Sequence, residues 1–162
     1  MPATKVTGEC SVILHNVRSI LNVGSIFRTA DAAGWHKVWL TGYTPGPDTE
    51  PERIHKTALG AEHSVAWGRA RRVGDLLRRL HKRGAHIVVL ERADGAIDYR
   101  AFRPHYPMAL VVGNEVEGTK DVTSHNLHDA VVGIPMRGVK ESLNVAVAFG
   151  VIAYELTRSR MP

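Results

Sequence analysis

The chain has 162 residues, of which 44% are hydrophobic and 23% are charged. This length suits one domain with a core of its own, so we expect residues 1–162 to form a single domain. The composition excludes a disordered or fibrous protein. The single cysteine, Cys10, excludes an intrachain disulfide and a Cys-rich zinc site. No apolar run has the length of a signal peptide or a membrane span, so we expect a soluble, cytoplasmic protein.

The net charge of +5 is concentrated in one segment. Residues 69–83 hold seven basic side chains and one acidic side chain, so this segment carries +6 and the rest of the chain carries −1. The segment fits an amphipathic helix with Leu76, Leu77 and Leu80 on its buried face. Its basic face is either a solvated surface or a surface that binds RNA in a salt-sensitive, sequence-independent way.

Apolar runs of strand length alternate with longer helical stretches along the chain, which is typical of an α/β fold with a mostly parallel sheet flanked by helices. Several of the runs are continuously apolar, as expected for strands that are covered on both faces. The predicted strands are residues 12–14, 38–41, 64–66, 86–90, 109–113 and 130–134.

Three helices follow from the spacing of apolar residues. The first covers residues 20–30 and ends at Gly34, and the second covers residues 73–80 and ends at Gly84. The third covers residues 143–158 and is apolar nearly all round, which indicates burial on two sides. One side would face the sheet and the other would face a second subunit.

The nine histidines suggest metal binding, but no His-Glu-x-x-His motif is present. The best pair is His125 and His128, which lie beside Asp129. A polar surface loop is the simpler interpretation of this pair, and we expect no metal site.

Residues 113–120 form a glycine-containing loop after a predicted strand and resemble a phosphate-binding loop. The resemblance fails because Thr119 precedes Lys120, whereas a P-loop has Lys directly after its second Gly. Glu115 and Glu117 would also repel phosphate. A nucleoside triphosphate site is therefore not expected. No G-x-G-x-x-G motif follows the first predicted strand, so an ordinary dinucleotide-binding fold has no support either.

Two other segments carry polar residues at predicted helix starts. Asn22 is placed to cap the first helix by accepting from the N–H of Ser25, and Ser142 is placed to cap the last helix, with Asn144 in its first turn. Arg28 could pair with Asp31 on the surface. Capping and surface pairing alone would account for these residues. However, these two segments and the glycine-containing loop also match the motifs of a known protein family.

The sequences NVGSIFRTAD (residues 22–31), LVVGNEVEG (110–118) and IPMRGVKESLNVAVA (134–148) resemble the three motifs of the SPOUT methyltransferases of the TrmH (SpoU) family. They occur in the order that the family has. The sequences KTALGAE (56–62) and VVLE (88–91) are also similar to the family.

The resemblance implies an α/β fold whose C-terminal part is tied in a deep trefoil knot, a feature that ordinary topology rules would not predict. It also implies a homodimer that transfers a methyl group from S-adenosylmethionine to the ribose 2′-hydroxyl of RNA. The implied cofactor-binding residues are Leu90, Glu91, Gly113, Gly118, Ile134, Met136, Ser142 and Leu143.

The resemblance implies that Arg28 is catalytic. A guanidinium is almost never deprotonated at neutral pH, so we expect Arg28 to bind the phosphate beside the target ribose and to stabilise the developing alkoxide. By the same resemblance Asn22, Ser142 and Asn144 orient Arg28 and the target nucleotide, and Glu115 orients polar parts of the site.

Four basic residues in or beside the motifs are the expected RNA phosphate contacts, namely Arg18, Lys56, Arg137 and Lys140. We expect the catalytic core alone, without an N-terminal RNA-binding domain, and transfer RNA rather than ribosomal RNA as substrate. Two alternatives remain open, namely a SPOUT enzyme that methylates a base nitrogen and a non-catalytic RNA-binding module of the same fold.

Overall fold

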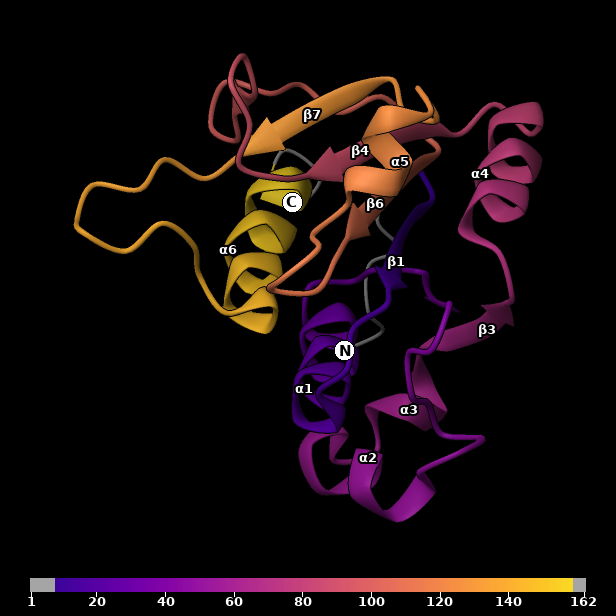
Figure 1. Cartoon of the computed structure of the whole chain (residues 1–162). Coiled ribbons are helices and arrows are strands. Elements are labelled where there is room, and N and C mark those ends of the chain that lie inside the picture. Colours follow the sequence, from indigo (N-terminus) through magenta and orange to yellow (C-terminus); the bar gives the residue numbers. More distant parts are fainter. Residues whose placement is uncertain (1–7, 159–162) are drawn as a thin grey trace.

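The computed structural model describes residues 8–158 and contains one seven-stranded sheet with helices on both faces (Figure 1). The strands are β1 (Cys10–His15), β2 (Lys37–Thr41), β3 (Ala66–Ala70), β4 (His86–Leu90), β5 (Ile97–Asp98), β6 (Met108–Val112) and β7 (Ala130–Gly133). The helices are α1 (Ile20–Ala32), α2 (Pro51–Ala58), α3 (Ala61–Ser64), α4 (Val73–Lys82), α5 (Lys120–Ser124) and α6 (Val145–Thr157).

The strand order is β3-β2-β1-β6-β4-β7-β5, and every neighbouring pair is parallel. All five residues of β6 are buried, as expected for a parallel strand covered on both faces. Because the strands are parallel, their carboxyl ends meet at one edge of the sheet, where α/β proteins place their binding sites. The predicted mostly parallel α/β fold is confirmed, whereas the trefoil knot stays a prediction.

Two hydrophobic cores fill the two sides of the sheet. The core beneath α1 and α6 contains Phe27 and Phe149, and the residues of β1 alternate between the two cores. The core beneath α4 and α5 contains Leu76, Leu77 and Val122. Helices α1 and α6 therefore lie side by side on one face, and α4 lies on the other (Figure 1).

Five of the six predicted strands are present, but the strand predicted at residues 64–66 is wrong. Leu59 and Gly60 have left-handed backbone angles (φ 52° and 93°), and the chain then turns through the short helix α3, which ends at Ser64. Strand β3 begins only at Ala66 and lies at the sheet edge, where its half-exposed residues give no apolar run.

The glycines predicted to end the first two helices do so, but both predicted N-cap residues are wrong. Gly34 and Gly84 follow α1 and α4 with positive φ angles (73° and 82°). Ser19, not Asn22, caps α1 by accepting from the Asn22 N–H. Asn144, not Ser142, caps α6. Helix α1 begins at Ile20 as predicted, so Asn22 already lies inside it, whereas α6 begins at Val145, later than the predicted start at residue 143.

Helix α4 is amphipathic as predicted, with Leu76 and Leu77 buried and Leu80 partly buried. The basic face of α4 is exposed on the side of the sheet opposite to α1, and one of its arginines, Arg78, pairs with Asp75 at 2.7 Å. Arg69 of the basic segment lies on β3 instead, where two hydrogen bonds, of 2.7 and 2.8 Å, link it to Asp48. A membrane span needs a longer apolar helix than any found between residues 8 and 158.

Candidate functional site

A pocket of about 190 Å³ opens at the carboxyl ends of β4, β6 and β7. The chain segments that follow these three strands, and the start of α6, form its walls. All eight residues that the sequence assigns to the cofactor line this one pocket: Leu90, Glu91, Gly113, Gly118, Ile134, Met136, Ser142 and Leu143. The structure therefore brings together residues from motifs that lie far apart in the sequence.

The loop after β6 makes a tight reversal that requires glycine at both ends. A Cβ added to Gly113 would lie 2.0 Å from the Gly118 carbonyl oxygen, and Gly118 itself has φ 58°. Inside the loop, the buried Asn114 side chain accepts from the backbone N–H of Val116 (2.9 Å) and Glu117 (2.7 Å). These bonds fix the loop that forms one wall of the pocket.

Glu91, directly after β4, anchors the end of this loop. Its carboxylate accepts from the backbone N–H and from the hydroxyl of Thr119, both at 2.9 Å. A Cβ on Gly118 would lie 2.3 Å from the same carboxylate, so a larger residue there would displace it. Glu91 thus holds the loop in place as well as lining the pocket.

Three polar side chains from the three motifs form a chain of hydrogen bonds. Asn144 Nδ2 donates to Asn22 Oδ1 at 3.1 Å, and Asn22 Nδ2 donates to Glu115 Oε1 at 3.1 Å. Asn144 Oδ1 meanwhile accepts from the first N–H groups of α6, which fixes its amide so that Nδ2 faces Asn22. The predicted polar residues Asn22, Glu115 and Asn144 therefore lie together, and Glu115 also lines the pocket.

A long segment, residues 134–144, connects β7 to α6 without helix or strand and projects from the body of the protein (Figure 1). Arg92 Nη1 donates to the Glu141 carbonyl at 3.2 Å and lies 3.7 Å from its carboxylate. Ser142 and Leu143 follow this attachment and line the pocket. The predicted RNA contacts Arg137 and Lys140 are exposed on the projecting segment.

Arg28 does not join this cluster within the described chain. It lies six residues beyond Asn22 on α1, which is about 9 Å along the helix axis, and its side chain is exposed. The surface pair with Asp31 is absent as well, because Asp31 accepts from the Ser64 hydroxyl at 2.7 Å. Between residues 8 and 158, the Arg28 guanidinium has no hydrogen-bond or ion-pair partner and is available to bind a ligand.

The other two predicted RNA contacts occupy different positions. Arg18 Nε donates to the Tyr43 hydroxyl at 3.1 Å, and that hydroxyl also accepts from Asn114 at 3.2 Å. The hydrogen bond to Tyr43 raises the pKa of Arg18. Arg18 is thereby connected to the loop after β6, whereas Lys56 is exposed on α2.

Tyr43, Asn114 and Thr119 also support the site, although no sequence motif marks them for this role. Asn114 and Tyr43 are 71 residues apart, and Thr119 and Glu91 are 28 apart. Their positions along the chain give one indication. Tyr43 and Asn114 closely follow strands β2 and β6, and Thr119 directly precedes α5, all at the edge of the sheet where the predicted site lies.

The arrangement is that of an α/β protein with a pocket at the carboxyl edge of a parallel sheet. The profile of the SpoU rRNA Methylase family matches residues 9–154. The chain therefore belongs to the SpoU methylase family.

Relatives in this family act on different RNAs. The chain is 32% identical over 153 residues to the tRNA (guanosine(18)-2′-O)-methyltransferase of Escherichia coli K12, with 94% of this chain and 64% of that protein covered. It is 37% identical over 152 residues to the 23S rRNA (guanosine-2′-O-)-methyltransferase RlmB of Ralstonia nicotianae, with 92% and 58% covered. The chain thus spans less than two thirds of the length of these relatives.

The fold is shared with solved structures. The AdoMet-bound rRNA methyltransferase from Sinorhizobium meliloti matches with a TM-score of 0.86 and 30% identity, covering 98% of this chain and 60% of that one. The match extends over nearly all of the sheet and helices described above.

Proposed function

We propose that this protein is an S-adenosylmethionine-dependent RNA 2′-O-ribose methyltransferase. The observation that carries the proposal is the hydrogen-bonded chain Asn144–Asn22–Glu115 at a pocket lined by all eight predicted cofactor residues. Similarity to two RNA 2′-O-methyltransferases, and to a structure with bound AdoMet, supports the same activity.

The pocket residues fit such a cofactor. Leu90, Ile134, Met136 and Leu143 present apolar surface suited to an adenine ring, and the surrounding loop backbone can read the ring edge. The close approach of Gly113 to Gly118 leaves no space for a side chain at that wall. When bound, S-adenosylmethionine would supply an electrophilic methyl group.

The chain must then align the ribose 2′-oxygen with that methyl group and assist loss of its proton. The polar chain Asn144–Asn22–Glu115 fixes two amides and a carboxylate at the pocket, where they orient the target nucleotide. Ser142 lines the pocket beside them and contributes a hydroxyl that both donates and accepts.

Arg28 supplies positive charge in this proposal. An exposed guanidinium without an intramolecular partner is suited to bind the phosphate next to the target ribose and to stabilise the oxyanion that forms. It acts as a fixed cation and not as the base, because guanidinium groups keep their proton at neutral pH.

A homodimer is part of the proposal. Exposed apolar side chains gather on the adjacent helices α1 and α6: Leu21, Val147, Val151 and Tyr154. The α6 members are spaced by four and three residues and so share one helix face. Arg28 lies seven residues after Leu21, nearly two full turns, so a second copy on this surface would lie close to Arg28.

Transfer RNA is the proposed substrate, bound through the exposed Arg18, Lys56, Arg137 and Lys140. The relatives include enzymes for both transfer and ribosomal RNA, and an assay with both RNAs distinguishes the two substrates. In this proposal, residues 1–162 act as one SPOUT domain in the cytoplasm.

The activity is tested by incubating the purified protein with S-adenosylmethionine and either unmodified transfer RNA or ribosomal RNA, followed by nucleoside mass spectrometry. The expected product is a single 2′-O-methylated nucleoside in the transfer RNA digest. A methylated base would favour the base-nitrogen alternative. Calorimetric binding of RNA without binding of the cofactor would favour the non-catalytic alternative.

A further inference from the structure

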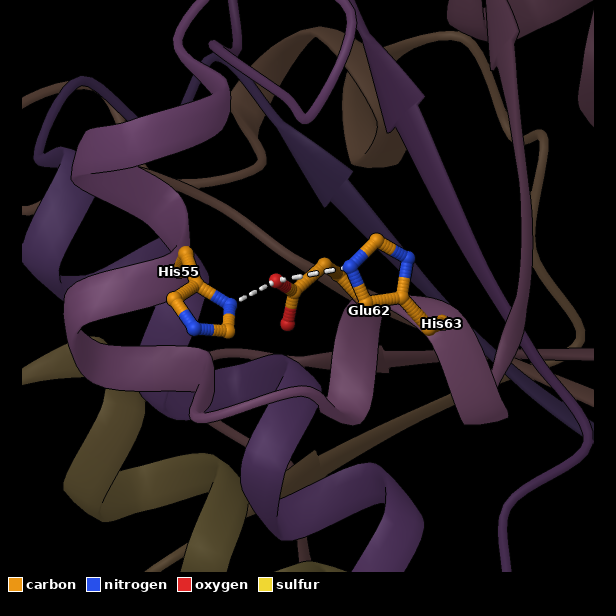
Figure 2. Close-up of side chains that lie close together, drawn as sticks. All are labelled: His55, Glu62 and His63. Atoms are coloured by element: carbon orange, nitrogen blue, oxygen red, sulfur yellow. Dashed lines mark hydrogen bonds and ion pairs between the residues drawn. The ribbon is translucent and has the colours of Figure 1, made fainter.

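A second cluster of ligand-type side chains lies away from the pocket, where α2 meets α3. Figure 2 shows the Glu62 carboxylate between the imidazoles of His55 and His63. Glu62 Oε1 lies 2.6 Å from His55 Nδ1 and 3.5 Å from His63 Nε2. The three candidate ligand atoms all lie within 4.8 Å of one another.

The backbone builds this cluster through an unusual turn. Leu59 and Gly60 are both left-handed, with φ angles of 52° and 93°, and they reverse the chain between α2 and α3. The reversal places Glu62 against His55, seven residues earlier, and leaves His63 on the other side of the carboxylate. Since a side chain at φ 52° is sterically disfavoured, the rest of the structure must hold Leu59 in this conformation.

Glu62 is the most unusual member of the cluster, because its side chain is only 4% exposed. Its second oxygen, Oε2, is buried and has no hydrogen-bond donor in the described chain. The result is a buried carboxylate with one oxygen unsatisfied, which a bound cation would compensate.

The two histidines are solvent-accessible, with side chains 60% and 79% exposed. Neutral imidazole and carboxylate are the ligands that Zn²⁺ and similar ions use, and three protein ligands leave a coordination position for water. We propose that His55, Glu62 and His63 form a binding site for a divalent transition-metal ion of the Zn²⁺ class.

One of the ligand separations already matches that of a metal site. Zn²⁺ lies about 2.0–2.2 Å from N and O ligands, so two ligands at a tetrahedral angle are separated by roughly 3.4 Å. The separation of His63 and Glu62, 3.5 Å, already has this value. The separation of His55 and Glu62 would have to lengthen from 2.6 Å, which a small rotation of the exposed imidazole accomplishes.

The location assigns the ion a structural role beside the proposed methyltransferase site. Helix α2 packs against α1 so closely that a Cβ on Gly24 would lie 1.8 Å from Thr57 Oγ1. The ion would join α2 to α3 and thereby brace the helix that carries Asn22 and Arg28. The site differs from the pair His125 and His128, which the sequence suggested and which does not cluster with a third ligand in the described residues.

The test uses the untagged full chain, stripped with a chelator and titrated with Zn²⁺ alone. We expect one tight equivalent of Zn²⁺ per chain, with affinity falling at least tenfold in His55→Ala, His63→Ala and Glu62→Gln. Both histidines are exposed, so their alanine variants should fold as the wild type does, which circular dichroism checks. Zn²⁺ should also raise the melting temperature of the wild type but not that of His63→Ala.

The matched control is His81→Ala, which removes another exposed histidine that lies 3.5 Å from a carboxylate, that of Asp129. This variant should bind Zn²⁺ as the wild type does. The proposal is overturned if the wild type binds no tight equivalent, or if His55→Ala and His63→Ala bind Zn²⁺ as tightly as His81→Ala. Because none of these measurements involves methyl transfer, their outcome is independent of the proposed function.

Discussion

The side chain of Asn144 caps helix α6 and at the same time donates a 3.1 Å hydrogen bond to Asn22 on helix α1. One amide therefore uses its oxygen for the fold and its nitrogen for the candidate site. The two roles can be separated by substitution, because an N-cap requires only an acceptor, whereas the bond to Asn22 requires a donor.

Asn144→Asp should keep the stability of the protein and lose activity. An aspartate caps a helix as well as asparagine does, so the free energy of unfolding should change by less than about 0.5 kcal/mol. Its carboxylate cannot donate to Asn22 and would face the Asn22 oxygen, so the methylation rate should fall at least tenfold. Urea denaturation and initial methylation rates measure the two effects.

Asn144→Ala is the companion variant. It removes the acceptor as well as the donor, so it should lose activity and also about 1 kcal/mol of stability. If Asn144→Asp methylates RNA at the wild-type rate, the hydrogen bond to Asn22 has no role in the reaction.

Arg28→Ala should separate turnover from folding in a different way. Because Arg28 is exposed and has no partner within residues 8–158, its removal should change the free energy of unfolding by less than about 0.5 kcal/mol. Affinity for S-adenosylmethionine should stay at the wild-type value, while the rate constant for methyl transfer drops by about 10²–10³-fold, as when an oxyanion-stabilising donor is lost. Calorimetry and single-turnover assays give these quantities.

Arg53→Ala is a suitable control, since Arg53 is also exposed and, among residues 8–158, makes only a surface pair with Glu50 at 3.6 Å. It should leave turnover unchanged. Wild-type turnover by Arg28→Ala would remove Arg28 from the proposed mechanism.

Val151→Glu should dissociate the proposed homodimer. Val151 is 38% exposed and lies between Val147 and Tyr154, which are 54% and 46% exposed, on one face of α6. A charge buried in an apolar interface without a partner is strongly unfavourable. Light scattering should give twice the 17.8 kDa chain mass for the wild type and the chain mass for the variant.

Ile97→Glu serves as the control for charge alone, because Ile97 is similarly exposed (41%) but lies on the edge strand β5 and not on α1 or α6. This variant should remain a dimer. A monomeric wild type, or a dimeric Val151→Glu variant, would show that this surface does not join two copies.

The strands of this fold could be predicted where apolar residues form an unbroken run, and not where glycine or a charged residue interrupts the run. Strand β6 is buried at all five positions and forms an unbroken apolar run. Edge strand β3 is partly exposed and contains a glycine and an arginine, so no run marks it. Helix α2 has only Ile54 and Ala58 buried, too few for a recognisable period.

The residues of the pocket could be identified because the three motifs resemble a family, but the bonds that order them could not. Asn144 and Asn22 are 122 residues apart, and Asn22 and Glu115 are 93 apart. Local periodicity carries no information about such pairs, which depend on how the strand ends meet at the sheet edge. The same limit applies to the His55–Glu62 contact, which depends on a left-handed turn at Leu59.

His86 should make the stability of the protein depend on pH below neutrality. Its ring stacks on Phe102 (centroids 6.2 Å apart, planes 6° apart), and its buried Nδ1 has no hydrogen-bond partner in the described chain. Burial lowers the pKa of His86, partly against the influence of Asp129, which raises it. The folded protein therefore binds a proton at His86 less readily than the unfolded chain does.

The sign of the effect follows from this difference. Above the unfolded value of 6.5 both states are neutral at His86, and the residue contributes no pH dependence. As the pH falls below that value, the unfolded chain takes up the proton first, so the free energy of unfolding decreases until the folded pKa is passed. Urea denaturation from about pH 7.5 to about pH 5.5 should therefore show a smaller loss of stability in His86→Gln than in the wild type. Equal losses in the two proteins would mean that His86 is not the group responsible.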